Sequence, residues 1–177
     1  MAANLGVLTA NRTASGDEMY TPKYAIYPLL EFIPVNAKIW CPFDTQESNF
    51  YKVLKMGGYE VICSHIFEGK DFFKYEPPEW DILISNPPYS KKDEVLKRAF
   101  AFEKPFALLL PVNALQGQER FNIFRNRIQL LSFDRRIHYA RDGGQVIKNA
   151  PFASAYFCRD FLPSKLELRE IKKEDTI

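Results

Sequence analysis

The chain has 177 residues, about the length of one domain; 46% of them are hydrophobic and 26% are charged. Fifteen Phe, nine Tyr and two Trp supply bulky core material, so the composition excludes a disordered or low-complexity protein. No stretch approaches the roughly 20 apolar residues of a membrane span, and the net charge of +2 indicates no partner by itself.

Apolar, β-rich runs alternate with segments of helical period, which predicts a parallel sheet covered by helices, in a single domain over residues 1–177. Thr21-Pro22 is typical of a helix start, and Pro28 should kink that helix. In chain order, the pattern predicts strands at 38–41, 59–64, 80–85, 106–111, 130–133 and 152–158, helices at 46–56 and 92–102, and a helical stretch around Phe121, Phe124 and Ile128. We expect the last two strands to pair antiparallel at the sheet edge. Residues 1–19 are expected to form an N-terminal arm and residues 163–177 a helical or frayed tail.

Cysteine and histidine usage excludes several kinds of chemistry. Cys41, Cys63 and Cys158 lie far apart without CxxC spacing, which argues against a disulfide framework and a zinc site. With only His65 and His138 available, histidine-rich metal chemistry and a Ser-His-Asp hydrolase are poorly supplied, and no metal is expected. The N-terminus has neither a cationic start nor an apolar run of secretory length, so we expect a cytoplasmic protein.

The most informative motif is Asn86-Pro87-Pro88-Tyr89, which directly follows a predicted central strand and precedes an amphipathic helix. Ligands of open parallel sheets collect beyond the carboxyl ends of the strands. The two prolines stiffen the turn, so the Asn86 side-chain oxygen and the Pro87 carbonyl can be held free to accept from a planar amino group, while the Tyr89 ring could stack on a base. The alternative is an ordinary turn that ends a strand, because proline and asparagine are common there.

This motif resembles the D/N-P-P-Y/F/W motif of the amino-group methyltransferases that use S-adenosylmethionine (AdoMet), above all the N6-adenine methyltransferases. The resemblance spans residues 20–158 and extends to short phage-encoded adenine methyltransferase-like proteins. It implies a Rossmann-like methyltransferase fold, with a mostly parallel sheet, an antiparallel edge strand and helices on both faces. For a viral protein, the expected location is the host cytoplasm.

The same resemblance implies a cofactor site for S-adenosyl-L-methionine. Its expected residues are Tyr20, Thr21, Pro22, Cys41, Pro42, Phe43, Asp44, Asp71, Phe72 and Asn86. Cys41-Pro42-Phe43-Asp44 stands where the family has Asp-Pro-Phe-Ala-Gly-Ser-Gly, so the glycines that allow a close backbone approach are missing. Asp44 is either the acidic group of this loop or a helix N-cap.

A basic segment offers a second expectation. The segment from Arg120 to Lys148 contains seven basic residues and only two acidic ones. They could contact nucleic-acid phosphates, or they could form a solvated helix face and polar loop. We assign nucleic-acid contacts to Arg120, Arg135, Arg136, Arg141 and Lys148. Because little chain follows the last predicted strand, a homodimer or a partner chain could supply target recognition.

The resemblance implies direct methyl transfer to the exocyclic N6 of adenine, in DNA rather than RNA. Asn86 and Pro87 would accept from N6, and Tyr89 with Phe152 would sandwich the base. Two alternatives stay open. The same tetrapeptide serves methyltransferases of other planar nitrogens, namely glutamine and guanine N2. The altered cofactor loop also fits a binding protein without turnover, for example a viral factor acting on host DNA or a host protein.

Overall fold

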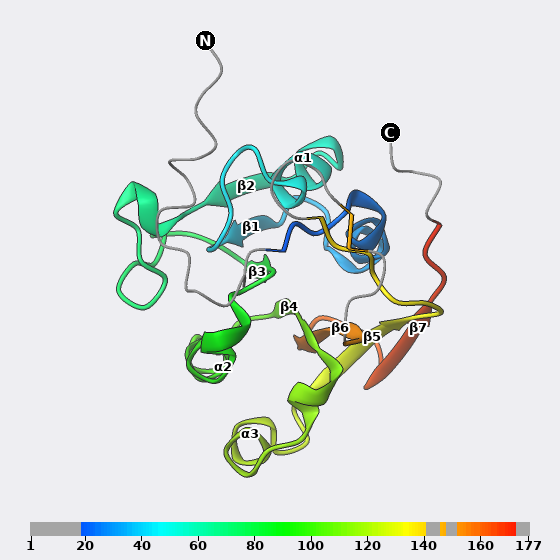
Figure 1. Cartoon of the computed structure of the whole chain (residues 1–177). Coiled ribbons are helices and arrows are strands. Elements are labelled where there is room, and N and C mark those ends of the chain that lie inside the picture. Colours follow the sequence, from blue (N-terminus) through cyan, green and yellow to red (C-terminus); the bar gives the residue numbers. More distant parts are fainter. Residues whose placement is uncertain (1–18, 141–145, 148–151, 173–177) are drawn as a thin grey trace.

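The structure is a computed structural model that describes residues 19–140, 146–147 and 152–172 (Figure 1). Its strands form one seven-stranded sheet in the order β2-β1-β3-β4-β6-β5-β7. The strands are β1 (Lys38–Cys41), β2 (Glu60–Cys63), β3 (Ile82–Ser85), β4 (Phe106–Pro111), β5 (Gln129–Phe133), β6 (Ser154–Arg159) and β7 (Leu166–Arg169). Neighbours are parallel except at β6, which is antiparallel to both β4 and β5. The predicted α/β, Rossmann-like class with a mostly parallel sheet is confirmed.

The predicted position of the antiparallel strand is wrong. β6 lies inside the sheet, because the segment expected to be a helical or frayed tail contributes β7, which pairs with β5. Residues 166–169 alternate between exposed and half-buried side chains, which is the two-residue period of an edge strand rather than the period of a helix. The charged composition concealed this period, since charges are common on edge strands.

Helices cover both faces of the sheet, as predicted (Figure 1). The helices are α1 (Asn49–Met56), α2 (Lys92–Ala101) and α3 (Gln118–Phe124), with short 3-10 turns η2 (Lys23–Ala25), η3 (Tyr27–Phe32), η4 (Ile66–Glu68), η5 (Tyr89–Lys91) and η6 (Val112–Leu115). One core layer joins α1 and η3 to the sheet, and a second joins α2 and α3 to its other face. None of the helices in the described ranges has the length and apolar character needed to span a bilayer.

The first predicted helix is instead two 3-10 turns, η2 and η3. Pro28 lies at the start of η3 and lacks the N–H that would continue a helix from η2, so the chain restarts there. The residue before η2 is Pro22, with no side-chain cap. Thr21, expected as an N-cap, instead accepts a hydrogen bond from Asn86.

The capping of α1 resolves one alternative for Asp44. Ser48 is the N-cap, and its hydroxyl accepts from the Tyr51 backbone N–H at 3.1 Å. The helix therefore begins at Asn49 rather than at residue 46, and the N-cap interpretation of Asp44 is wrong. The Asp44 carboxyl is free for another contact.

Candidate active site

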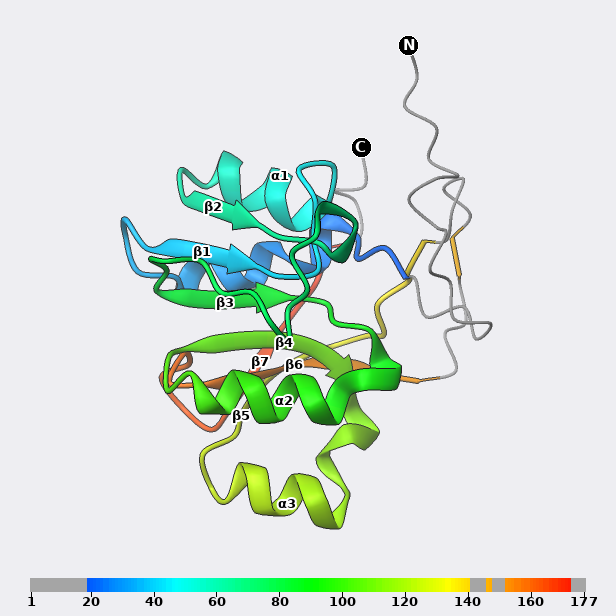
Figure 2. The same ribbon diagram turned by 90° about the vertical axis from the view of Figure 1, so that its left-hand side faces the viewer.

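The carboxyl ends of β1 and β3 bring two distant segments together. β1 and β3 are parallel neighbours, so the residues that follow them meet at one edge of the sheet. Asp44 follows β1, and Asn86-Pro87-Pro88-Tyr89 follows β3. Figure 2 shows the arrowheads of β1 to β4 pointing the same way, toward the edge where α2 begins. We call this the carboxyl edge.

Asn86 is held in one orientation at this edge. Its side-chain nitrogen donates to the Met19 carbonyl at 3.1 Å and to Thr21 Oγ1 at 3.2 Å. Because a carbonyl can only accept, the NH₂ group must face Met19 and the side-chain oxygen must point elsewhere. That oxygen, Oδ1, is buried and has no hydrogen-bond partner within the described part of the chain. A buried, unpaired acceptor costs roughly 1–3 kcal/mol, so it indicates a position that a ligand donor would satisfy.

The segment that holds Asn86 is the one expected to open the cofactor site. Thr21 is buried, and its carbonyl accepts from Asn49 Nδ2 at 2.9 Å. Tyr20, 43% exposed, exchanges both backbone hydrogen bonds with Ala140. Pro22 is half-buried and leads into η2. The structure therefore places Tyr20, Thr21 and Pro22 beside Asn86, as one strap across the carboxyl edge.

Asp44 links the β1 loop to the Asn86 turn. The Ser85 hydroxyl donates to Asp44 Oδ2 at 2.6 Å, and Ser85 is the residue directly before Asn86. Burial raises the pKa of the Asp44 carboxyl to about 6, although hydrogen bonds from Ser85 and Ser48 act in the opposite direction. The carboxyl is thus poised to change its charge near neutral pH.

The other residues of the β1 loop are mostly buried. Cys41 is fully buried, and burial raises the pKa of its thiol well above the usual value. Pro42 is also buried, while Phe43 is half-buried and contacts the Phe72 ring at a centroid distance of 4.9 Å. The backbone carbonyl of Cys41 accepts from Ser64 N. These residues brace the loop from inside.

The side chains of Asp71 and Phe72 lie in different surroundings. Asp71 is half-buried, and its Oδ1 accepts from the Phe73 backbone N–H at 3.0 Å. Phe72 is only 2% exposed and packs against Trp40, so its ring belongs to the core. Of the two adjacent rings, Phe72 and Phe73, it is Phe73 that is half-buried. Asp71 therefore reaches the surface of this loop, whereas Phe72 does not.

Tyr89 is joined to two residues that the sequence analysis did not name, Tyr139 and Ser154. Its hydroxyl lies 3.1 Å from the hydroxyl of Tyr139, which donates to Ser154 Oγ at 2.7 Å. The Tyr89 and Phe152 rings meet nearly edge to face, with centroids 5.4 Å apart and planes at 80°. A signal that could have indicated Tyr139 is the alternation of Ile137 and Tyr139 with polar residues, which is typical of a half-buried extended segment.

The basic residues do not form one free patch in the described ranges. Arg120 pairs with Asp93 at 2.7 Å and is only 16% exposed. Arg135 pairs with its neighbour Asp134 at 2.6 Å. Arg136 also interacts with another group of the protein. Arg141 and Lys148 lie outside the described residues.

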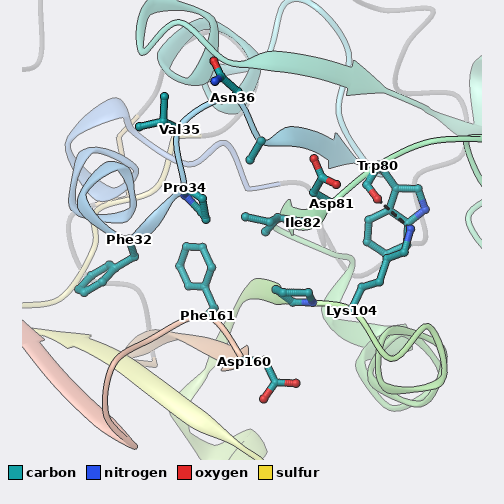
Figure 3. Close-up of a pocket in the computed structure, with 12 residues that line it drawn as sticks. Phe32, Pro34, Val35, Asn36, Trp80, Asp81, Ile82, Lys104, Asp160 and Phe161 are labelled. Carbon is teal, nitrogen blue, oxygen red and sulfur yellow. Dashed lines mark hydrogen bonds between the residues drawn. The ribbon is translucent and has the colours of Figure 1, made fainter.

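A pocket lies at the opposite edge of the sheet (Figure 3). It has a volume of about 540 Å³ and is lined by residues just before β1, β3 and β4 and just after the antiparallel β6. Phe32, Pro34, Ile82 and Phe161 form its apolar walls, and Figure 3 shows Lys104 extended alongside Trp80. We call this the amino edge. In the described part of the chain, no group of three or more His, Cys, Asp or Glu side chains could hold a metal ion.

Comparisons with known proteins give weak similarities only. No protein-family model matches the chain, and no curated protein is similar to it. A candidate class I S-adenosylmethionine-dependent methyltransferase from Listeria monocytogenes shares 13% identity at a TM-score of 0.46, covering 94% of this chain and 69% of that one. The modification subunit of a candidate type I restriction enzyme from Vibrio vulnificus shares 10% identity at a TM-score of 0.44, covering 97% of this chain and 51% of that one. This chain thus spans about half the length of the second protein.

Proposed function

We propose that this chain is an AdoMet-dependent methyltransferase that acts on the exocyclic N6 of adenine in nucleic acid, with DNA as the favoured substrate. The observation that carries the proposal is Asn86 Oδ1, a buried and unpaired acceptor at the carboxyl edge. It immediately precedes the two prolines of a stiff turn, and its orientation is fixed by two hydrogen bonds. An exocyclic amine is a planar donor that would satisfy this oxygen.

The residues of the turn divide the work. Asn86 Oδ1 and the Pro87 carbonyl accept the two N6 hydrogens, which holds the nitrogen lone pair toward the methyl donor. Pro87 and Pro88 keep both acceptors in place because their φ angles are fixed. Tyr89 offers a ring face to the base after it has left the helical stack.

Phe152 must move before it can cover the other face of the base. In the structure its ring stands nearly perpendicular to that of Tyr89, and the two rings touch. A sandwiched base needs two roughly parallel ring faces with space between them. Binding of adenine therefore includes a rotation of Phe152 away from Tyr89.

The carboxyl edge fits an AdoMet site. Asp44 and Asp71 supply carboxylate oxygens on the loops that follow β1 and β2, and the segment 20–22 lies beside Asn86. Asp71 would accept from the adenine amino group of the cofactor, and Asp44 would favour a nearby cation when ionised. When bound, AdoMet supplies an activated methyl group that the N6 amine can attack in line.

Nucleic-acid contacts would come from Arg135 and Arg136, together with Arg141 and Lys148. Arg120 would contribute less, because its guanidinium is already paired with Asp93. Such contacts position a duplex without reading its sequence. Each phosphate contact that is lost should lower the slope of log affinity against log salt by about 1.

A binding protein without turnover is the second candidate, and one observation favours it. The Asp44 carboxyl, in the loop expected to hold the cofactor, is only 9% exposed and is bonded to Ser85. Titration calorimetry with AdoMet separates the two functions. Micromolar affinity supports the enzyme, and no binding at physiological AdoMet concentration supports the binding protein.

Transfer of a tritiated methyl group from AdoMet tests the substrate. Unmethylated DNA, RNA and a protein fraction are offered in parallel, and the labelled nucleosides are then separated. Label in N6-methyladenine supports the proposal. Label in glutamine or guanine N2 would show that the enzyme methylates another planar nitrogen. Tight AdoMet binding without any label would contradict methylation of adenine, glutamine and guanine alike.

A further inference from the structure

Three hydroxyl groups form a chain that ends on Tyr89. Tyr139 donates its single hydroxyl hydrogen to Ser154 Oγ at 2.7 Å. The Tyr89 and Tyr139 hydroxyl oxygens lie 3.1 Å apart, so Tyr89 is the donor in this second bond. The tip of the Tyr89 ring is therefore tied to protein, and only the ring faces are left for a substrate.

The far end of this chain is anchored in the sheet. Ser154 is the first residue of β6, where it pairs with Pro111 of β4 in the middle of the sheet. Tyr139 is fully buried, and its backbone carbonyl accepts from Ile147 N at 2.7 Å. The preceding residue, His138, donates its N–H to the Tyr24 hydroxyl at 2.8 Å. Tyr139 is therefore fixed at its backbone and at its hydroxyl.

Tyr89, in contrast, lies on a short turn, with its half-buried ring packed against the core layer of α2. It begins the short turn η5 directly after Pro88, and no side-chain cap holds that turn. Its ring contacts Phe152, the residue that must rotate when a base binds. Once Phe152 moves, the hydroxyl bond to Tyr139 is a directional contact that still restricts the orientation of the Tyr89 ring, beside its packing against the core layer.

We infer that Tyr139 is a positioning residue that sets the plane of the Tyr89 ring for stacking on the target base, with Ser154 as its anchor. This inference rests on the proposed function of the Asn86 turn. Tyr139 does not touch the substrate. It acts through Tyr89, by restricting the ring to the orientation in which N6 meets Asn86 Oδ1.

The hydroxyl chain is neutral over the working pH range. Burial raises the pKa of Tyr139 to about 12 and raises the pKa of Tyr89 above its usual value. Neither hydroxyl ionises between pH 6 and 9, so the effect of removing it should not vary with pH there. This property separates the role of Tyr139 from that of Asp44, whose pKa lies near 6.

The test is a double-mutant cycle with Tyr89→Phe, Tyr139→Phe and the double variant. Each single change should lower kcat for methyl transfer roughly tenfold while KM for AdoMet stays unchanged, because the ring loses its orientation and the cofactor site is intact. The double variant should be no slower than the slower single variant, since both changes remove the same bond. Tyr156→Phe is the matched control. It removes another buried hydroxyl bond, to the Ala25 carbonyl at 3.0 Å, without touching Tyr89, and its kcat should equal that of wild type.

Wild type, the two single variants and the double variant are also unfolded in urea, so that the cycle has a readout independent of activity. Each single change should raise the unfolding constant several-fold, with the larger effect in Tyr139→Phe, which also loses the bond to Ser154. The double variant should match Tyr139→Phe. Additive effects on the unfolding constant, or wild-type kcat in Tyr139→Phe, would overturn the positioning role. If wild type transfers no methyl group, the proposed function fails, and the unfolding cycle alone then decides whether Tyr139 holds Tyr89.

Discussion

The two edges of the sheet differ in what they leave unsatisfied. At the amino edge, the pocket is spacious, but two of its charged side chains have partners: Lys104 Nζ donates to the Trp80 carbonyl at 2.8 Å, and Asp81 accepts from the Lys38 backbone N–H. At the carboxyl edge, Asn86 Oδ1 is buried and unpaired. The buried carboxyl of Asp44 lies near it, because it accepts a hydrogen bond from Ser85, the residue before Asn86. Among the described residues, buried side-chain polar atoms without a partner occur in Asn86, Arg98 and Arg120. Of these, Asn86 lies at the carboxyl edge, whereas the free volume lies at the amino edge.

This difference follows from the fold. The amino edge collects the loops that enter the parallel strands, and the side chains of Phe32, Ile82 and Phe161 meet there without filling the space. The carboxyl edge collects the turns that leave the strands, which is where open α/β sheets bind ligands. Asn86 Oδ1 lies there without a hydrogen-bond partner in the described part of the chain. We therefore expect substitutions at the carboxyl edge to change methyl transfer, and substitutions at the amino edge to change stability while methyl transfer stays at the wild-type rate.

The largest effect is expected for Asn86→Ala. The change removes the proposed acceptor for N6, and methyl transfer should fall by about 10²–10³-fold, as for the loss of one preorganised hydrogen-bonding group at a reacting centre. The rate is measured with tritiated AdoMet under single-turnover conditions. Asn122→Ala, on the exposed side of α3, is the matched control and should keep the wild-type rate. A wild-type rate in Asn86→Ala would remove the turn from the mechanism.

Asp44→Asn should change how stability depends on pH. Burial raises the pKa of Asp44 from 3.8 to about 6 in the folded protein, so its stabilising protonated form is fully present below about pH 4 and is lost as the pH rises through 6. Relative to wild type, the free energy of unfolding of the Asn variant should therefore rise between pH 4 and 7, by up to about 3 kcal/mol. Urea unfolding at several pH values measures it. A flat difference, or one that falls as pH rises, would contradict the burial of an ionisable carboxyl at this edge.

Phe161→Ala tests the amino edge. The ring is 8% exposed and packs against Phe32, so its loss should cost about 2 kcal/mol, below the usual range because the pocket already leaves one side of the ring without contacts. Equilibrium unfolding in urea reports the cost. The single-turnover rate of the folded variant should equal that of wild type. A rate loss of tenfold or more would show that the two edges are coupled.

Lys104→Met should have the smallest effect. The change keeps most of the stem but removes the hydrogen bond to the Trp80 carbonyl and the contact of the ammonium with the Trp80 ring, whose centroid is 4.3 Å away. We expect a loss of about 1 kcal/mol in the free energy of unfolding, measured in urea at low salt, and an unchanged methyl-transfer rate. A variant more stable than wild type would contradict this prediction, because it would mean that the half-buried ammonium of Lys104 destabilises the fold.

Much of the fold is present in the sequence as local pattern. The strands at 38–41 and 106–111 and the helix at 92–102 were predicted to within one residue, because their apolar periods and end signals are strong. The tail strand β7 was missed, since four residues of alternating exposure carry too little local signal to outweigh a charged composition. Pairing with β5, which is a tertiary contact, decides its conformation.

The site was predictable only in part, for a similar reason. Asn86-Pro87-Pro88-Tyr89 is contiguous, so its order after a strand could be recognised from the sequence. The bond between Asp44 and Ser85 joins residues 41 positions apart and depends on β1 and β3 being neighbours. The bond between Tyr89 and Tyr139 spans 50 positions and depends on where β5 and β6 lead the chain. No local pattern encodes either contact.

The role of Asn86 can be seen in a crystal structure of the protein with adenosine and S-adenosylhomocysteine. We expect N6 of the adenosine to lie about 3 Å from Asn86 Oδ1, with its base against the Tyr89 ring and Phe152 rotated away. Adenosine bound in the amino-edge pocket between Phe32 and Phe161, with Asn86 Oδ1 still unpaired, would contradict it.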